Sequence, residues 1–394
     1  MQKITAAGIF DGNGNLLKNK TLYLDDKGTI LDIRDTPADT GDIRHLVGYL
    51  CPGFVNTHCH LELSHMKGKV DTGTGLIPFI KDVVTKRDID PEQIADAIRQ
   101  ADRDMYDAGI VAVGDISNKT DTSDTKANSP IRYYTFVEMF DFMQESMAEQ
   151  TFRQYKEVYD GFPESEKDCK SMVPHAPYSV SERLYRLLAD ANTSPKTISV
   201  HNEETPDEMA LFLENKGGFP SFFGGFGMSL AHWKATGQTP IFHLLEKLDP
   251  KHKTLFVHNT LTTEEGIQAA QAWSDQVYWA TCANANLYIE NRLPTYQRFL
   301  NQNAKMTIGT DSLTSNWQLS VWEEIKTIRK YASYVQLTEL ITWATKNGAE
   351  ALGFDDELGT IEAGKKPGLV VLVGIREENG HYMLDNSVSR RYMG

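Results

Sequence analysis

The feature that most constrains this 394-residue chain is an alternation of short apolar runs with longer stretches of helical periodicity. This pattern is typical of βα units repeated around a parallel sheet. The apolar runs fall at residues 49–56, 110–115, 131–136, 170–174, 197–200, 254–257, 277–281 and 305–309. Eight such runs with intervening helices favour an α/β fold in which the strands close into a (β/α)8 TIM barrel, rather than an open sheet.

The two ends of the chain carry a different pattern. Residues 9–33 contain short strand-like runs broken by the turn-forming clusters DGNGN and DDKG, and residues 358–375 read LGTIEAGKKPGLVVLVGI. We therefore expect the N- and C-terminal segments to pair into one small β-sandwich. The predicted organisation is a composite sandwich of residues 1–48 and 355–394 around a barrel of residues 49–354.

Composition limits the partners of the chain. The net charge is -14, from 54 acidic and 40 basic residues, and such a balance repels nucleic acid and anionic lipid. The N-terminal MQKITAAGIFDGNG lacks the basic and apolar regions of a signal peptide, so a cytoplasmic protein is expected. Four widely spaced cysteines without a CxxC pair favour neither disulfides nor a zinc knuckle.

Polar side chains follow several of the apolar runs, where a barrel would place its active site. The first run ends in NTHCH, and alternation along an extended segment puts His58 and His60 on the same side. The fifth run ends in His201, and the eighth ends in Asp311. Three imidazoles and a carboxylate are ligands that suit one divalent cation. The sequence therefore predicts a metal site made of these four residues.

Two further residues stand beside this predicted metal site. Glu204 lies three residues after His201, and His258 ends the sixth run. A purely structural role is the alternative for these residues. Glu204 could be a surface carboxylate in the first turn of a helix, where the helix dipole favours acidic side chains. His58 and His60 could likewise be a partly buried pair with ordinary hydrogen bonds. Chance assembly of all these residues at strand ends is improbable, so we favour the functional interpretation.

These motifs resemble those of the metal-dependent amidohydrolases, in the branch of aminopurine and nucleoside deaminases and related chlorohydrolases. PGFVNTHCH is similar to the family's first-strand metal motif, VHNEE to its HxxE motif, and VHNT and GTDS to its sixth- and eighth-strand motifs. IEAGKKPGLVVL resembles the segment that returns to the family's β-sandwich, with Gly368 in place of the usual Asp. The resemblance covers nearly the whole chain.

The resemblance implies a hydrolytic mechanism. A cation such as Zn²⁺ lowers the pKa of bound water from about 15.7 towards about 7, which supplies hydroxide. His258 and Asp311 would hold and deprotonate this water, and Glu204 would carry a proton to the substrate. His175, in VPHAPYSVS, would contact the substrate. No lysine ends the fourth run, where dinuclear relatives bridge two metals, so one ion is implied, Zn²⁺ or alternatively Fe²⁺.

Two loop motifs narrow the range of candidate substrates, because they resemble one group of deaminases more than another. HCHLELS and GTDSLTSN resemble the aminodeoxyfutalosine deaminases more than the adenosylhomocysteine deaminases. We expect a deaminase of an aminopurine-type nucleoside or related amino-heterocycle, with aminodeoxyfutalosine as the leading candidate. Hydrolysis of a cyclic amide, imidazolone or ring chloride remains an alternative, as does a non-catalytic metal-containing barrel that only binds a ligand. The glycine- and aromatic-rich segment 215–237 is expected to pass over the barrel mouth rather than to form another helix, with a plain surface loop as the alternative. A homo-oligomer remains open.

Overall fold

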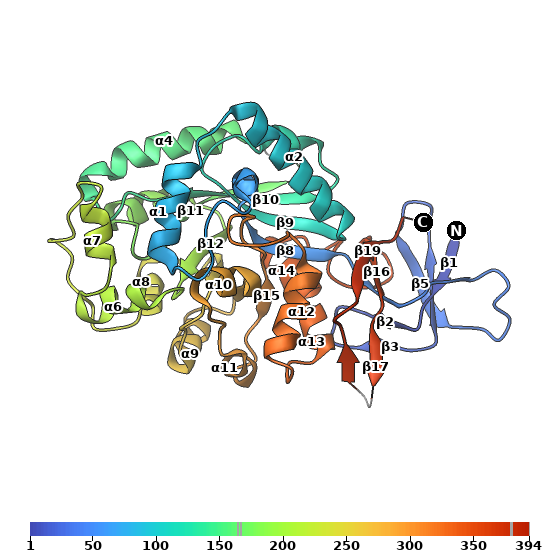
Figure 1. The fold of residues 1–394 in the computed structure, drawn as a ribbon. Helices are drawn as coiled ribbons and strands as arrows, with labels where there is room; N and C mark the ends of the chain where they lie inside the picture. Colours follow the sequence, from blue (N-terminus) through green and yellow to red (C-terminus); the bar gives the residue numbers. More distant parts are fainter. Residues whose placement is uncertain (164, 166–167, 379–380, 394) are drawn as a thin grey trace.

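The computed structural model describes residues 1–163, 165, 168–378 and 381–393. Within these ranges, the central part of the chain contains two four-stranded parallel sheets, ordered β8-β9-β10-β11 and β12-β13-β14-β15 (Figure 1). The strands are β8 (Phe54–Cys59), β9 (Ile110–Ser117), β10 (Arg132–Met139), β11 (Cys169–Pro174), β12 (Thr197–Asn202), β13 (Lys253–His258), β14 (Val277–Thr281) and β15 (Met306–Ile308).

The outer strands of the two sheets meet near their carboxyl ends. Cys59, the last residue of β8, forms a parallel bridge with Asp311, just after β15. On the other flank, the His201 N–H in β12 donates to the His175 carbonyl oxygen just after β11, at 2.9 Å. These contacts bring the ends of all eight strands to one side of the molecule, as the predicted chemistry requires.

The first predicted run, 49–56, is two strands in the structure. Its first half is β7 (Tyr49–Pro52), which belongs to a sheet at the chain ends, and its second half is β8. The chain changes sheets at Gly53, where a Cβ atom would lie 2.3 Å from Val111 Cγ1 and 2.8 Å from the Pro367 carbonyl oxygen. Only glycine fits this close approach.

Strands from both ends of the chain form two further sheets, ordered β5-β4-β1-β6 and β19-β16-β7-β2-β3 (Figure 1). β16 pairs with β7 antiparallel, so the C-terminal segment completes a sheet begun near the N-terminus, as expected. The exact division at residues 48 and 355 stays a prediction. The strands are β1 (Gln2–Thr5), β2 (Gly8–Phe10), β3 (Leu16–Leu17), β4 (Lys20–Leu24), β5 (Ile30–Asp35), β6 (Arg44–His45), β7, β16 (Leu369–Val373) and β19 (Val388–Arg391), with a separate hairpin of β17 (Arg376–Glu378) and β18 (His381–Met383).

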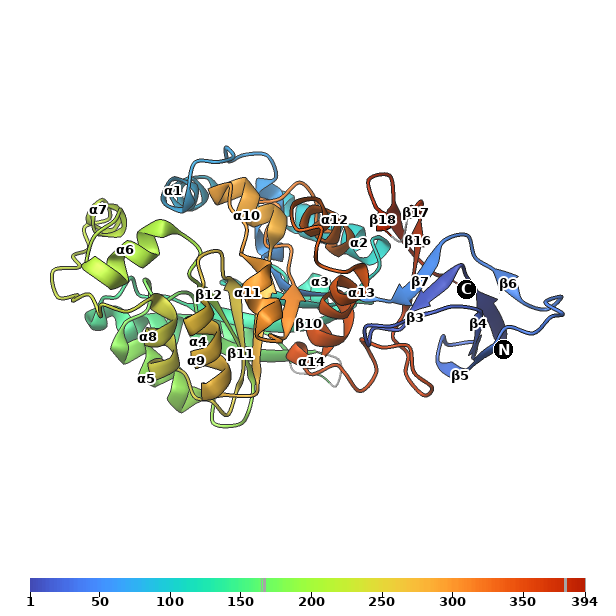
Figure 2. The same cartoon turned by 90° about the horizontal axis from the view of Figure 1, so that it is seen from below.

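Helices connect the parallel strands and lie mainly outside them (Figure 2). Capping residues mark where several helices begin. Asp90, just before α2, accepts hydrogen bonds from two backbone N–H groups in the first turn of that helix, and Ser181 caps α5. The helices are α1 (Leu76–Lys86), α2 (Pro91–Asp107), α3 (Ser123–Asn128), α4 (Ala148–Gly161), α5 (Glu182–Ala191), α6 (Pro206–Glu214), α7 (Phe219–Gly224), α8 (Pro240–Lys247), α9 (Glu264–Trp273), α10 (Ala283–Glu290), α11 (Tyr296–Asn301), α12 (Val321–Tyr331), α13 (Leu337–Thr342) and α14 (Gly348–Leu352), with short helices η1 (Leu61–Met66), η2 (Glu145–Met147) and η3 (Trp343–Asn347).

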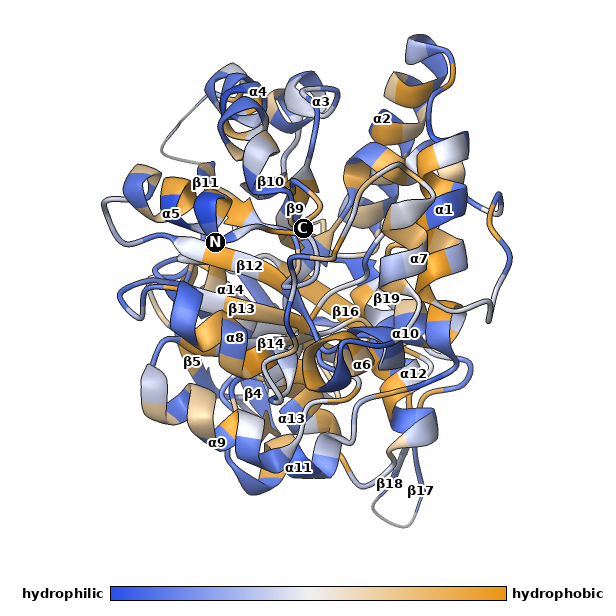
Figure 3. Ribbon diagram, turned by 90° about the vertical axis from the view of Figure 1, so that its left-hand side faces the viewer, coloured by the Kyte–Doolittle hydropathy of each residue, from blue (hydrophilic) through white to orange (hydrophobic). Residues whose placement is uncertain are grey.

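Apolar side chains of the parallel strands and the surrounding helices form the main core. Figure 3 shows hydrophobic colour along β12 and β13, whereas the helices around them carry both polar and apolar residues. Val200, Phe256, Trp279 and Ile308 belong to this core and are almost completely buried. Among the described residues, no helix combines the length and the hydrophobicity needed to cross a membrane.

Candidate active site

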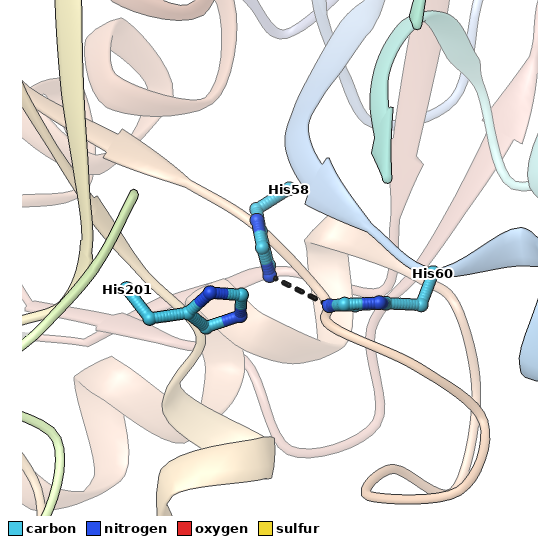
Figure 4. A group of neighbouring side chains, drawn as sticks. All are labelled: His58, His60 and His201. Carbon is cyan, nitrogen blue, oxygen red and sulfur yellow. Dashed lines mark hydrogen bonds between the residues drawn. The ribbon is translucent and has the colours of Figure 1, made fainter. Parts of the chain in front are cut away.

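Three imidazoles converge at the carboxyl ends of the parallel strands. His58 comes from β8, His60 follows that strand directly, and His201 comes from β12 (Figure 4). The Nε2 atoms of His58 and His60 are 3.2 Å apart, and one ring nitrogen from each of the three residues lies within 4.8 Å of the others. The alternation along β8 therefore places the two neighbouring histidines on the same side, as the NTHCH motif predicts.

Asp311 adds a carboxylate to this group. Its Oδ1 lies 3.4 Å from His60 Nε2 and 3.9 Å from His58 Nε2. Its φ of 57° is unusual for a residue other than glycine, and its N–H donates to the His58 carbonyl oxygen at 3.0 Å. The Ser315 hydroxyl donates to Oδ2 at 2.6 Å. Backbone and side-chain contacts thus turn Oδ1 toward the histidines.

The spacing of these four residues, and the protonation of His58 and His201, fit one divalent ion. Ligand atoms at about 2.0–2.1 Å from a tetrahedral ion lie roughly 3.3 Å apart, and the two shortest separations are 3.2 and 3.4 Å. Burial lowers the pKa of His58 and of His201 well below the ordinary value, so both rings are neutral. Neutral imidazole and ionised carboxylate are the forms that bind metal.

A second group of possible ligands, Glu138, His175 and His201, shares one residue with the first. His201 Nδ1 lies 2.8 Å from the His175 carbonyl oxygen, which can only accept, and 3.3 Å from Glu138 Oε1. The proton of the neutral His201 ring therefore sits on Nδ1, and Nε2 keeps its lone pair for the first group. This tautomer favours the ligand set that contains His58 and His60.

Glu204 and His258 lie beside the proposed ligands as a buried pair. Glu204 Oε1 is 3.6 Å from His258 Nε2. Burial, with the charge of Asp311 adding to it, raises the pKa of Glu204 well above its usual value, whereas burial lowers the pKa of His258. Glu204 can therefore hold a proton near neutral pH, and His258 can accept one. The pair combines an acid and a base in one cavity.

Backbone geometry fixes the position of Glu204. The preceding residue, Glu203, has a φ of 47°, and the N–H groups of Glu203 and Glu204 donate to the Glu208 carboxyl group at 3.0 and 2.9 Å. Glu208 lies in the first turn of α6 and is fully buried. Hydrogen bonds to the Glu208 side chain of the following helix thus stabilise the sharp turn after β12.

Six of the predicted site residues line one pocket of about 720 Å³: His60, His175, His201, Glu204, His258 and Asp311. One wall is apolar and is formed by α1 with Leu76, Phe79, Ile80 and Val83. The remaining lining is largely polar. A pocket with an apolar wall and a few convergent polar groups suits a flat heterocycle that carries hydrogen-bonding atoms. The polar lining comprises His60, Arg87, Asn118, Glu138, His175, Tyr178, His201, Glu204, His258, Asp311 and Ser312.

The glycine- and aromatic-rich segment 215–237 packs beside this pocket, and the expectation that it forms no helix was wrong, because it contains the short helix α7. Phe219, in α7, stacks on the pocket residue Tyr178 with ring centroids 4.2 Å apart. Phe223 contacts Phe142, and His232 hydrogen-bonds to the Met143 carbonyl oxygen at 2.8 Å. The segment is therefore anchored to neighbouring loops and supports one side of the pocket.

The structure brings all of the sequence-predicted site residues together around this pocket, with His175 also lining it. Three further residues that contact a proposed metal ligand or base were not singled out from the sequence. Glu138 was missed because the predicted run ended at residue 136, whereas β10 continues to Met139. Asn286 and Ser315 follow β14 and β15, but they contact His258 and Asp311 rather than lining the pocket themselves. A search for polar residues one turn beyond each strand could have found them.

Comparison with known proteins gives consistent matches over most of the chain. The family model described as "Amidohydrolase family" matches residues 49–386. Aminodeoxyfutalosine deaminase of a Nitratiruptor species is 30% identical over 329 residues, which are 80% of this chain and 76% of that protein.

Two solved structures share the fold. Helicobacter pylori aminofutalosine deaminase in complex with methylthio-coformycin has a TM-score of 0.80 at 24% identity, over 96% of this chain and 94% of that one. An adenosine deaminase from Xanthomonas campestris with bound zinc has a TM-score of 0.73 at 22% identity, over 94% and 84%.

Proposed function

This chain belongs to the amidohydrolase family, and we propose that it is a hydrolytic deaminase of adenosine-like nucleosides, with aminodeoxyfutalosine as the leading candidate substrate. As an enzyme of this family it is a hydrolase of C–N bonds other than peptide bonds. The eight parallel strands are proposed to close into the predicted (β/α)8 barrel. The observation that carries the proposal is the Glu204–His258 pair, buried beside the convergent histidines and Asp311.

His58, His60, His201 and Asp311 are the residues that would hold one divalent ion, with zinc favoured over iron. The ligand spacing fits either metal, and the zinc-containing adenosine deaminase of similar fold supports zinc. A divalent ion held by such ligands lowers the pKa of a water from about 15.7 towards about 7. The protonation of the surrounding residues then decides which of them accept a proton during the reaction and which donate one.

The reaction adds water to the amine-bearing ring carbon and releases ammonia. The proton of the attacking water passes to His258 Nε2 or to the Asp311 carboxylate: burial lowers the pKa of His258, and both residues face the same cavity. Glu204 delivers its proton to the ring nitrogen next to the attacked carbon. The proton taken from the water then passes to the amino group, which leaves as ammonia, and the proton of the new hydroxyl group returns to Glu204 as the carbon–oxygen bond becomes a carbonyl. Each residue returns to its starting protonation state.

The pocket lining also supports binding of a purine ring. The apolar wall of α1, and Tyr178, which is stacked on Phe219, can pack against the ring. His175 lines the pocket, and its Nδ1 lies 2.7 Å from the Ser179 hydroxyl. That contact leaves Nε2 available for the substrate.

The test is ammonia release from aminodeoxyfutalosine, adenosine and related aminopurines by the zinc-loaded enzyme and by Glu204→Gln. The wild type should release ammonia, and the variant should lose about 10²- to 10⁴-fold in kcat with unchanged zinc content. Glu203→Gln is the matched control, since this neighbouring buried carboxylate faces the Ile241 N–H at 3.3 Å. Turnover of lactams with a silent amine panel would refute the deaminase assignment.

A further inference from the structure

Asn286 makes a contact that the proposed chemistry leaves unexplained. It lies in α10, just after β14, and only 1% of it is exposed. Its Oδ1 is 2.8 Å from Nδ1 of His258, which is also 1% exposed. His258 adopts a φ of 71° at the end of β13. The ring is therefore contacted at Nδ1 by an amide of the next βα unit.

The chemistry of this contact fixes the proton on the imidazole. A neutral ring carries one proton, on Nδ1 or on Nε2. An amide oxygen can only accept, so its hydrogen bond to Nδ1 requires the proton to be there. Nε2 then keeps its lone pair, and this is the atom that lies 3.6 Å from Glu204 Oε1 and faces the pocket.

Stability alone does not explain an asparagine at this position. Its Nδ2 is buried and, among the described residues, has no hydrogen-bond partner. Leaving a buried amide donor unpaired costs stability, and an apolar side chain of similar size would avoid that cost. The side-chain hydrogen bond to His258 is the interaction that offsets this cost. A polar group that costs stability but contacts a proposed base is expected where function requires it.

We propose that Asn286 is a positioning residue that holds His258 in the Nδ1–H tautomer, so that Nε2 can accept the proton of the attacking water. This inference rests on the proposed function, because it assigns His258 as a base. Asn286 acts through His258, and it contacts none of the four proposed metal ligands by a hydrogen bond in the described structure. The role therefore predicts lost activity without lost metal.

The experiment compares Asn286→Leu, Asn286→Asp and the control Asn192→Leu. Asn192 is another buried asparagine, but its Nδ2 donates to the Met172 and Leu188 carbonyl oxygens at 2.8 and 3.1 Å, and it does not line the pocket of the site. Asn286→Leu should lower kcat/KM by about 10²-fold or more while zinc content is kept and Tm does not fall. Asn286→Asp keeps an acceptor at Nδ1 and should recover most of the loss. Asn192→Leu should lower Tm and leave kcat/KM unchanged.

A spectroscopic measurement separates this inference from the proposed function. In zinc-loaded protein labelled with ¹⁵N-histidine, the His258 signals should report the Nδ1–H tautomer, and Asn286→Leu should shift them toward the other tautomer or a mixture. An unchanged tautomer in that variant, or unchanged kcat/KM, would overturn the role of Asn286. If the wild type deaminates nothing, the proposed function fails, whereas the spectra still decide whether Asn286 selects the tautomer.

Discussion

Ser315 provides the sharpest test of how the site is held. Its hydroxyl donates to Asp311 Oδ2 at 2.6 Å, and both residues are buried. A hydrogen bond to a charged group contributes about 1.5–3 kcal/mol. If Ser315→Ala loses this amount in the transition state, kcat/KM falls roughly 10- to 160-fold, since about 1.36 kcal/mol corresponds to a factor of ten.

The assay measures kcat/KM for ammonia release at saturating zinc, together with the zinc Kd from competition with a chelator. The Kd should rise, because a freed Asp311 carboxylate is a less preorganised ligand. Ser171→Ala is the matched control: its buried hydroxyl donates to the Thr197 carbonyl oxygen at 2.7 Å, near the other end of β11. If Ser315→Ala keeps wild-type kcat/KM and zinc affinity, the hydrogen bond does not position Asp311.

Two further outcomes follow from burial. Burial lowers the pKa of His175 to about 3 and that of His58 and His201 well below the ordinary value, whereas unfolded histidines titrate near 6.5. Below pH 6.5 these histidines therefore bind protons in the unfolded state but not in the folded state. Each such histidine therefore contributes a fall in stability of about 1.4 kcal/mol per pH unit, whereas buried carboxyl groups with a raised pKa, such as Glu204, contribute the opposite slope. In urea unfolding of the metal-free protein, His175→Gln should remove one histidine contribution, so the stability difference between wild type and variant should change by about 1.4 kcal/mol between pH 6 and pH 5, and a constant difference would contradict this. Phe219→Ala removes the ring stacked on Tyr178 and should cost about 3–5 kcal/mol in unfolding experiments. It should raise KM more than it lowers kcat, and an unchanged KM would show that α7 does not shape the pocket.

The sequence predicts the strands and the main site residues because both depend on local patterns. Apolar runs mark the parallel strands, and the residue that follows each run lies at the strand end. His58 and His60 share a side because strand geometry alternates, which requires no knowledge of distant contacts. The predicted residues therefore meet as soon as the strands are arranged side by side.

The rest depends on distant parts of the chain. Gly53 divides the first predicted run because its backbone meets Val111 and Pro367, which lie far away in sequence. Asn286 reaches His258 only because α10 packs beside the end of β13. The role of segment 215–237 follows from the stacking of Phe219 on Tyr178, a contact between side chains that no local pattern indicates.

The pairing of β7 with β16 also determines the order in which this protein can fold. β7 leads directly into β8, the first of the parallel strands, yet its partner lies near the other end of the chain. During synthesis, β8 and the strands after it are made while β7 still has an open edge on the side that β16 will cover. Contacts of such long sequence separation form slowly, and an open strand edge can pair with other chains. The last strands therefore complete the sheet and also cover a strand edge at which other chains could pair.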